Sequence, residues 1–449
     1  MIIRSFSLFT MSVAFVSAAV LGLPAAQKVQ TGARPQPSAS GRCLAAGMKG
    51  NDVGAKINAC DAKLGSNQGE ILLSGGGTIS TPVIISSNHT LRVSGGIYKA
   101  TAGGPVIRLK DDSALVCDSL DAVLEESTGK NGEAGVRPFT IVAAYAGTSL
   151  DSLNGTLTRN LSIRGCHFRG ARSDFDSASQ TITLGNCHNC SVTNNWLEAT
   201  RTIGIQTGGG SGMGNYADNV IIAKNLLTTV ASQNIAVVNS SNVQVTDNTM
   251  RAPGLANGPG VVPIDIEPNV GDRIVNIKIA NNLVDMTNTV LDASGAKALH
   301  GIAINNLNRA NPFTGVEVSK NTIYGAGLKD PYNHISGGLI LVRAASNTLI
   351  SNNILRRGTY CILIDSGSSK VTVSGNQLST CGSGSTQSVK IVDSSNNLFL
   401  ENKLWGDPAN QFDLSQIARI IVEMGASNNN TFRGNDAVIS LSGRGSRKQ

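Results

Sequence analysis

A nine-residue unit recurs through the chain from residue 189 onward. Its copies begin with Asn, Gly or Lys and have an apolar residue at the fourth position, an Asn at the seventh and an apolar residue at the ninth. NCSVTNNWL, from Asn189 to Leu197, and NVIIAKNLL, from Asn219 to Leu227, are two of the copies. The internal Asn falls at positions 195, 225, 248, 282, 321, 353, 376, 402 and 435, in steps of 23 to 39 residues. Repetition at this period is typical of solenoids, in which each repeat packs against its neighbours.

A second apolar segment, with alternating apolar residues, precedes each unit. Ile235 with Val237, and Ile264 with Ile266, are examples. Period-two alternation predicts strands with one face in a core. The gaps are often too short, and show too little helical periodicity, for the helices of a doubly wound α/β fold. The sequence therefore predicts an all-β protein, a right-handed, single-stranded parallel β-helix of about ten coils spaced about 4.8 Å apart.

The repeated Asn is predicted to form an internal ladder. In stacked coils, each Asn amide donates to one neighbouring amide and accepts from the other, so every rung is satisfied. We expect the side chains from Asn195 to Asn435 in one internal row. Asn is also common in turns generally, but that preference does not explain a fixed offset from an apolar strand in nine units.

The N-terminal segment has the pattern of an export signal. Arg4 precedes an apolar stretch from Phe6 to Leu23, and small residues follow it. Residues 1–26 are therefore predicted to be a signal peptide, and a secreted, periplasmic or cell-surface location is expected. A membrane anchor is the alternative, because the stretch is close to a minimal span. No later segment is apolar enough to span a membrane, so no membrane association is expected after signal cleavage.

The rest of the chain is predicted to form one domain. Residues 27–42 are polar and contain Pro, as in a linker; 43–437 contain the β-helix, and 438–449 are predicted as a C-terminal tail. A short N-terminal helix capped by Asn51 or Asp52 is expected to cover the open end of the stack, where unpaired strand edges would promote aggregation.

Export permits disulfides, and the chain has eight Cys. Cys43 and Cys60 bracket a short segment, and Cys361 and Cys381 lie about one coil apart, so both pairs are predicted disulfides. The pairing of the remaining four is left open; they are Cys117, Cys166, Cys187 and Cys190. A zinc site at Cys187 and Cys190, with His188 between them, is a weaker alternative because the usual second pair of ligands is missing.

The segment GMKGNDVGAKINACDAKLGSNQGEILLSGGGTISTPVIISSNHTLRVSGGIY, from Gly47 to Tyr98, resembles the first coils of pectate-lyase-superfamily β-helix proteins. In that pattern a Gly-rich turn and a short helix lead to a G-G-x-I/V strand and then a T-L-x-x-x-G-G strand. With the repeats, the resemblance covers nearly all of the chain after the signal. It implies the fold but not one reaction, since the superfamily includes lyases, hydrolases, epimerases, phage tailspikes and proteins without assigned activity.

Two well-marked enzyme groups of this superfamily are not matched. Polygalacturonases carry Asn-Thr-Asp, Asp-Asp, Gly-His-Gly and Arg-Ile-Lys motifs, of which only His300-Gly301-Ile302 is a faint counterpart. The Asp-Pro-His motif of mannuronan epimerases is missing.

Composition and charge favour an anionic polysaccharide partner. Aromatic residues make up only 4% of the chain and Gly contributes 50 residues, which suits a narrow core of thin layers. The formal charge of +7 is spread without a basic block, as expected for a partner such as a uronate polymer, although it also fits a charge that serves only solubility. Nucleic acid is not expected, because zinc-finger spacing and a basic helix with aromatics are missing.

Residues between the core positions of successive strands are expected to line one long outer face. Asp265 and Glu267 stand out there, because carboxylates at i and i+2 on a strand face the same way, roughly 6.6–7 Å apart. They suit a shared Ca²⁺ or an acid/base pair with water between them. The surrounding motif resembles the Asp-x-Glu-Pro-Asn of other bacterial β-helix proteins. The other predicted contacts with the polysaccharide are Gln206, Asn305, Asn306, Tyr332 and Asp365.

The favoured function is a lyase that acts on an acidic polysaccharide. Elimination needs a cation to stabilise the enolate and a base. Asp265 and Glu267 would hold Ca²⁺, Arg343 would neutralise the substrate carboxylate, and His334 or Lys329 would be the base. The alternatives are a glycoside hydrolase that uses Asp265 and Glu267 directly, and a non-catalytic carbohydrate-binding or structural β-helix. The sequence gives no basis for an oligomeric state.

Overall fold

The computed structural model describes residues 41–102, 105–126, 141–144, 157–170, 180–200, 202–209, 216–228, 230, 232–251, 261–289, 300–308, 310–325, 338–381, 387–405 and 420–449. The predicted signal peptide and all but the last two residues of the predicted linker lie outside these ranges. The described residues belong to one compact unit that spans Ala39–Gln449.

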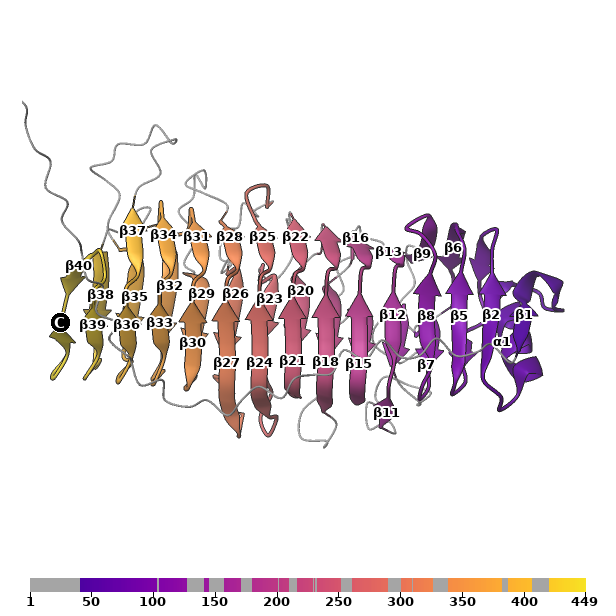
Figure 1. The fold of residues 1–449 in the computed structure, drawn as a ribbon, viewed down its shortest axis with the longest axis horizontal. Coiled ribbons are helices and arrows are strands. Elements are labelled where there is room, and N and C mark those ends of the chain that lie inside the picture. Colours follow the sequence, from indigo (N-terminus) through magenta and orange to yellow (C-terminus); the bar gives the residue numbers. More distant parts are fainter. Residues whose placement is uncertain are drawn as a thin grey trace, which may run out of the picture. The chain divides into compact units, whose positions relative to one another are not determined.

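Three parallel sheets run along the stack, and each coil contributes one strand to each sheet in most of the chain (Figure 1). Sheet A has 16 strands, namely β1 Arg42–Leu44, β2 Gly69–Leu73, β5 His89–Val93, β8 Ala114–Cys117, β11 Thr158–Arg159, β12 Ser162–Arg164, β15 Cys187–Thr193, β18 Ala217–Ala223, β21 Ser240–Thr246, β24 Ile274–Ala280, β27 Phe313–Ser319, β30 Thr348–Ser351, β33 Thr372–Ser374, β36 Leu398–Leu400, β39 Thr431–Arg433 and β41 Arg447–Lys448.

Sheet B has 12 strands, namely β3 Gly77–Ile79, β6 Gly96–Ala100, β9 Ala122–Glu126, β13 His167–Arg169, β16 Trp196–Glu198, β19 Leu226–Thr228, β22 Thr249–Arg251, β25 Leu283–Asp285, β28 Thr322–Tyr324, β31 Ile354–Arg356, β34 Gln377–Ser379 and β37 Lys403–Trp405. Sheet C has 13 strands, namely β4 Val83–Ile85, β7 Ile107–Leu109, β10 Val142–Ala144, β14 Gln180–Leu184, β17 Ile203–Thr207, β20 Gln233–Val237, β23 Ile264–Ile266, β26 Ile302–Asn305, β29 Gly338–Arg343, β32 Tyr360–Asp365, β35 Val389–Val392, β38 Ile420–Met424 and β40 Val438–Ser440.

The stack is deeper than the ten coils predicted, because the less regular first third of the chain also adds coils to all three sheets. Its C-terminal boundary also differs from the prediction. Residues 438–449 were predicted as a tail, but β40 pairs with β38 and β41 pairs with β39. Strands of two or three residues carry too little alternation to be seen in the sequence, whereas in the structure they extend existing sheets.

The core follows the period-two pattern. Alternate Ile, Val and Leu residues of the three sheets are buried in a single cluster, and a few aromatic side chains join it, such as Phe168, Phe399 and Phe432. Phe399 and Phe432, from adjacent coils, stack with their ring centroids 4.9 Å apart. Each layer thus packs on the next, which explains how a chain with few aromatic residues fills its interior.

The predicted ladder is confirmed. Asn Nδ2 of each rung donates to Oδ1 of the next rung from Asn195 through Asn435, at 2.8–3.0 Å. The same Oδ1 also accepts the backbone N–H of the preceding rung, as when Asn282 Oδ1 accepts from Asn248 at 3.0 Å. Each amide therefore satisfies both side-chain and backbone groups inside the stack.

The Asn that begins several units has a separate role. Asn189, Asn219, Asn242 and Asn276 have φ between 52° and 58°, the left-handed conformation that Asn tolerates better than most residues. Their side chains bond between coils at the surface: Asn219 Nδ2 donates to Asn189 Oδ1 at 2.8 Å, and Asn276 Nδ2 donates to Asn242 Oδ1 at 2.7 Å. Asn242 Nδ2 donates to Asp218 Oδ1 instead, at 2.8 Å. The first Asn of the unit thus gives the sheet A strand that contains it a local left-handed residue, whereas the second fills the interior.

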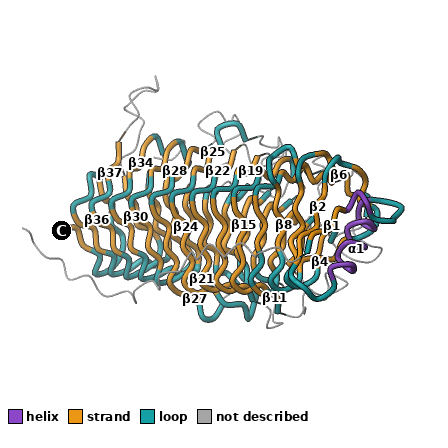
Figure 2. The backbone as a smooth tube through the Cα atoms, turned by 45° about the vertical axis from the view of Figure 1, so that its right-hand side comes forward, coloured by secondary structure: helices purple, strands orange, loops and turns teal. Residues whose placement is uncertain are grey.

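The N-terminal end of the stack is covered by helix α1, Val53–Leu64, which follows the short 3₁₀ helix η1, Ala45–Gly47 (Figure 2). Asp52 caps α1 by accepting from the Ala55 backbone at 3.1 Å, and it also accepts from the hydroxyls of Ser80 and Thr81 at 2.7 Å. Burial opposes its ionisation, but these hydrogen bonds lower the pKa of Asp52 to about 2. Within the described ranges, no helix has the length and apolar character needed to cross a membrane.

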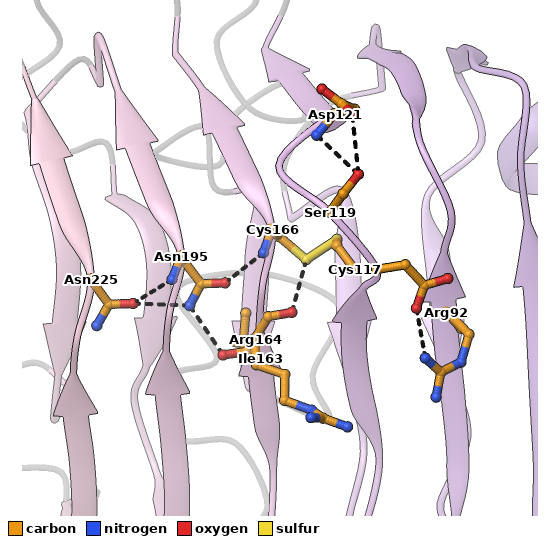
Figure 3. The surroundings of a disulfide bond; sticks show 10 residues. Arg92, Cys117, Ser119, Asp121, Ile163, Arg164, Cys166, Asn195 and Asn225 are labelled. Carbon is orange, nitrogen blue, oxygen red and sulfur yellow. Dashed lines mark hydrogen bonds and ion pairs between the residues drawn. A yellow bond between two sulfur atoms is a disulfide. The ribbon is translucent and has the colours of Figure 1, made fainter.

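All eight Cys are in disulfides. The predicted pairs Cys43–Cys60 and Cys361–Cys381 are confirmed. The pairing left open is Cys117–Cys166 and Cys187–Cys190, so the zinc alternative at Cys187 and Cys190 is wrong. Figure 3 shows that the Cys117–Cys166 bridge stands where the Asn ladder begins, since the Cys166 backbone N–H donates to Asn195 Oδ1 at 3.0 Å.

Candidate functional site

Asp265 and Glu267 lie on the outer side of sheet C. The flanking Ile264 and Ile266 of β23 are fully buried in the core. Alternation therefore directs Asp265 and Glu267 outward together, as the sequence predicts. Their surroundings are nevertheless unequal, because Asp265 is only 5% exposed whereas Glu267 is exposed to solvent.

A glutamine from the preceding coil links the two carboxylates. Gln233, the first residue of β20, donates its Nε2 to Asp265 Oδ2 at 2.6 Å and to Glu267 Oε2 at 3.3 Å. Asp265 Oδ1 is buried and has no hydrogen-bond partner among the described residues. Gln233 is not among the residues predicted from the sequence, where only its position two residues before the core residue Ile235 offered a signal.

The carboxyl group of Asp265 has a strongly perturbed pKa. Burial is the largest cause, and the neighbouring charge of Glu267 acts in the same direction; together they raise the pKa well above 3.8. A hydrogen bond to Glu267 also favours the protonated form, whereas the one from Gln233 opposes it. The pair therefore combines a buried carboxyl group whose surroundings favour its protonated form with a carboxyl group that is exposed to solvent.

Arg343 and Asp365 form an ion pair on the same sheet, two and three strands from β23. Arg343 Nε lies 3.0 Å from Asp365 Oδ1, and Nη2 lies 2.9 Å from Oδ2, which is bidentate geometry. The hydrogen bond to Asp365 raises the pKa of Arg343 further. Arg343 was predicted to neutralise a substrate carboxylate, but in the structure its guanidinium already pairs with the carboxylate of Asp365.

The predicted amide contacts separate into two groups. Asn305 is half-exposed and pairs in register with Arg343. Gln206 is half-buried in the same row as Asp265, two strands earlier, with Ala236 between them. Asn306 contradicts the prediction: it is 8% exposed, and its Oδ1 accepts from the Ala310 backbone at 2.7 Å, so it fixes the following turn. Adjacent residues on a strand point to opposite sides, which separates Asn306 from Asn305.

Three of the predicted site residues cannot be placed relative to the pair. Lys329, Tyr332 and His334 lie outside the described residues. Asn269 is the last residue of the Asp-x-Glu-Pro-Asn motif. It has a local role, because its backbone N–H donates to Asp272 Oδ2 at 2.7 Å in a turn.

The described residues contain no group of three or more Cys, His, Asp or Glu side chains arranged to hold a metal. Asp265 and Glu267 offer only two carboxylates, and the amide nitrogen of Gln233 contacts both of them. Calcium takes six to eight oxygen ligands, and an amide nitrogen between the carboxylates does not fit such a site. Calcium binding here stays a prediction.

Comparison with known proteins supports the architecture. The family model described as a right handed beta helix region matches residues 269–437, and those residues contain the coils from β24 to β39. The chain is a right-handed parallel β-helix protein. No curated protein matches this β-helix protein in sequence.

Solved structures share the fold at low sequence identity. The catalytic unit of a thermostable GH87 α-1,3-glucanase from Streptomyces thermodiastaticus is 15% identical, with a TM-score of 0.54 over 92% of this chain and 69% of that one. A mutant tailspike of E. coli bacteriophage HK620, in complex with a pentasaccharide, is 14% identical, with a TM-score of 0.52 over 87% of this chain and 63% of that one. An exopolygalacturonase from Thermotoga maritima is 12% identical, with a TM-score of 0.50 over 76% and 87%.

Proposed function

We propose that this β-helix protein is an exported glycoside hydrolase in which Asp265 and Glu267 are the catalytic pair. The observation that carries the proposal is a buried carboxyl group, that of Asp265, and an exposed one, that of Glu267, both bound by the same side-chain amide of Gln233. Glycosidases combine two carboxyl groups whose surroundings push their pKa values apart, one as the acid and one as the base or nucleophile. Four disulfides suit an oxidising compartment, and the glucanase and polygalacturonase named above act on polysaccharides.

The proposed reaction uses the two carboxyl groups in turn. Asp265 donates its proton to the glycosidic oxygen as the bond from that oxygen to the anomeric carbon breaks. Glu267 takes a proton from the water that adds to the anomeric carbon. A proton then passes from Glu267 back to Asp265, so one water is consumed and neither residue is changed. Gln233 holds both carboxyl groups in place through its shared amide.

The test is a screen of the protein against neutral and uronate polysaccharides, with reducing ends as the readout. We expect Asp265→Asn and Glu267→Gln each to lower kcat by about 10²–10⁴-fold, with no loss of melting temperature. Glu317→Gln is the matched control, because Glu317 is an outward carboxylate on sheet A that pairs with Lys278. Full activity of the double variant would exclude the pair, and a large loss of stability would make it structural.

The lyase prediction needs a cation and a base that this pair does not supply. Arg343 is bound to Asp365, and Lys329 and His334 are not described. The same screen tests the prediction, because elimination leaves an unsaturated sugar and hydrolysis does not. A product that is unsaturated, and that disappears with a chelator, would support the lyase with Ca²⁺ over the hydrolase.

A further inference from the structure

Lys390 and Tyr360 form a cationic feature further along sheet C. Lys390 Nζ lies 5.3 Å from the centroid of the Tyr360 ring, within the range of a cation–π contact. Both side chains are half-buried, and Tyr360 packs against an apolar cluster of Ala303, Leu341 and Leu363. The lysine therefore sits on a ring that is itself held in place.

Register connects this feature to the acid pair without interruption. Asp265 pairs with Ala303, which continues through Leu341 and Leu363 to Lys390. The three apolar residues between them are buried, so they offer no surface to a ligand. A parallel line beside them stays partly exposed, and it contains Glu267, Asn305, Arg343 and Asp365.

The coil spacing matches the repeat of an extended glycan. Four strand steps of about 4.8 Å separate β23 from β35, about 19 Å in all. One step is close to the length of one hexose unit, so a glycan laid along the sheet presents about one sugar to each coil. The coil of Lys390 then meets the fourth sugar from the one at Asp265 and Glu267.

Charge distinguishes this position from the ones before it. Arg343 is paired with Asp365, whereas Lys390 has no carboxylate partner in the part of the chain that the structure describes. An ammonium group has three N–H donors, and the ring of Tyr360 accepts on one side only. The N–H groups that do not face the ring are therefore available to an anionic ligand.

We propose that Lys390 and Tyr360 form a subsite for a negatively charged sugar, four units from the bond that Asp265 and Glu267 cleave. The substrate class is therefore an acidic glycan, and the protein binds it along the coils that are C-terminal to the acid pair. The subsite rests on the proposed function for its distance from the cleaved bond. Its affinity for an acidic glycan is independent of catalysis.

The test measures binding by calorimetry with two probes, a hexamer of galacturonic acid and its methyl-esterified form. Three variants are compared with the unmodified protein, namely Lys390→Gln, Lys390→Arg and the control Lys99→Gln. Lys99 is an exposed lysine on sheet B. We expect Lys390→Gln to weaken binding of the acid hexamer by about 10- to 100-fold, the loss of one bond to a charged group, and to flatten its salt dependence. Lys390→Arg should retain most of the affinity.

The outcomes separate this subsite from the hydrolase proposal. Equal binding of the acid and the ester, unchanged binding in Lys390→Gln, or no binding of the acid hexamer would each overturn the subsite. None of these depends on whether Asp265→Asn is inactive. Conversely, an Asp265→Asn protein that keeps full activity refutes the acid pair while a Lys390 effect on the acid hexamer upholds the subsite.

Discussion

Asp265 and Glu267 are two residues apart and share one face, yet water reaches them very differently. The side chain of Asp265 is closed off beneath its surroundings, whereas Glu267 is exposed. Burial and the adjacent charge both favour the protonated form of Asp265. A group with a pKa that is higher in the folded than in the unfolded chain binds its proton more tightly when folded, so stability depends on pH through this residue.

We expect Asp265→Asn to gain stability relative to the unmodified protein as pH rises. The stabilisation from the protonated carboxyl is fully present below the ordinary carboxyl pKa, and it is lost as pH rises through the raised value. The asparagine cannot ionise, so the difference in free energy of unfolding grows by about 1.4 kcal/mol for each unit by which the pKa is raised. Urea unfolding across a pH series measures it, and parallel curves for both proteins would contradict the raised pKa.

The direction of these side chains was predictable from the sequence, but their burial was not. Alternation with Ile264 and Ile266 fixes which side of the strand Asp265 faces. Its depth depends on what neighbouring coils place beside it, and Gln233 comes from another coil 32 residues earlier. The ion pair of Arg343 could not be predicted for the same reason. Its partner Asp365 is 22 residues away in sequence and becomes adjacent only through strand register.

At the scale of the element, the repeating unit is a strand, a turn and an amide. Each ladder Asn replaces hydrogen bonds that the turn cannot make with backbone alone. Asn282 accepts from both the backbone and the side chain of Asn248, and its own Nδ2 donates to Asn321 Oδ1 and to the Val245 carbonyl. The loss of one rung thus leaves buried groups on both neighbouring coils without partners.

Asn282→Ala should lower the free energy of unfolding by about 1–3 kcal/mol, because buried donors and acceptors lose their partners. Lys278→Ala, on the same coil but exposed at the surface of sheet A, should change it by no more than about 0.5 kcal/mol. Thermal and denaturant melts followed by circular dichroism compare the two. Equal melts of both variants would mean that the ladder adds little to stability.

The sequence was most informative where a unit recurs in full. Nine Asn at one offset from an apolar strand predicted an internal row, and the row exists. The surface bond between Asn189 and Asn219 was not predicted, since it depends on a left-handed backbone conformation that sequence spacing does not reveal. Strands β40 and β41 were missed because each is too short to alternate.

Across the whole described unit, each coil is held by its contacts with the two neighbouring coils. Each strand of sheet C from β7 to β38 pairs with the strand of the coil before and the coil after. Stability in such an array is the sum of many similar neighbour contacts. The first coil is the exception, because α1 packs on it through Asp52 and through Asn58, which donates to the Pro82 carbonyl at 2.9 Å.

Because each coil pairs only with its two neighbours, one whole coil can be inserted or deleted without changing the pairing of the others. Trp196 and Leu226 occupy equivalent positions in adjacent coils. Removal of residues 196–225 therefore joins Asn195 to Leu226, and each remaining strand still pairs in its original register with a strand of the same sheet. We expect that shortened protein to fold with a cooperative melt, and removal of Trp196 alone to disrupt it, because a one-residue slip turns side chains to the wrong face. Circular dichroism and melting temperature decide between them. Gene segments of this size can thus lengthen or shorten the sheet C surface in whole steps, each close to one sugar of a bound chain.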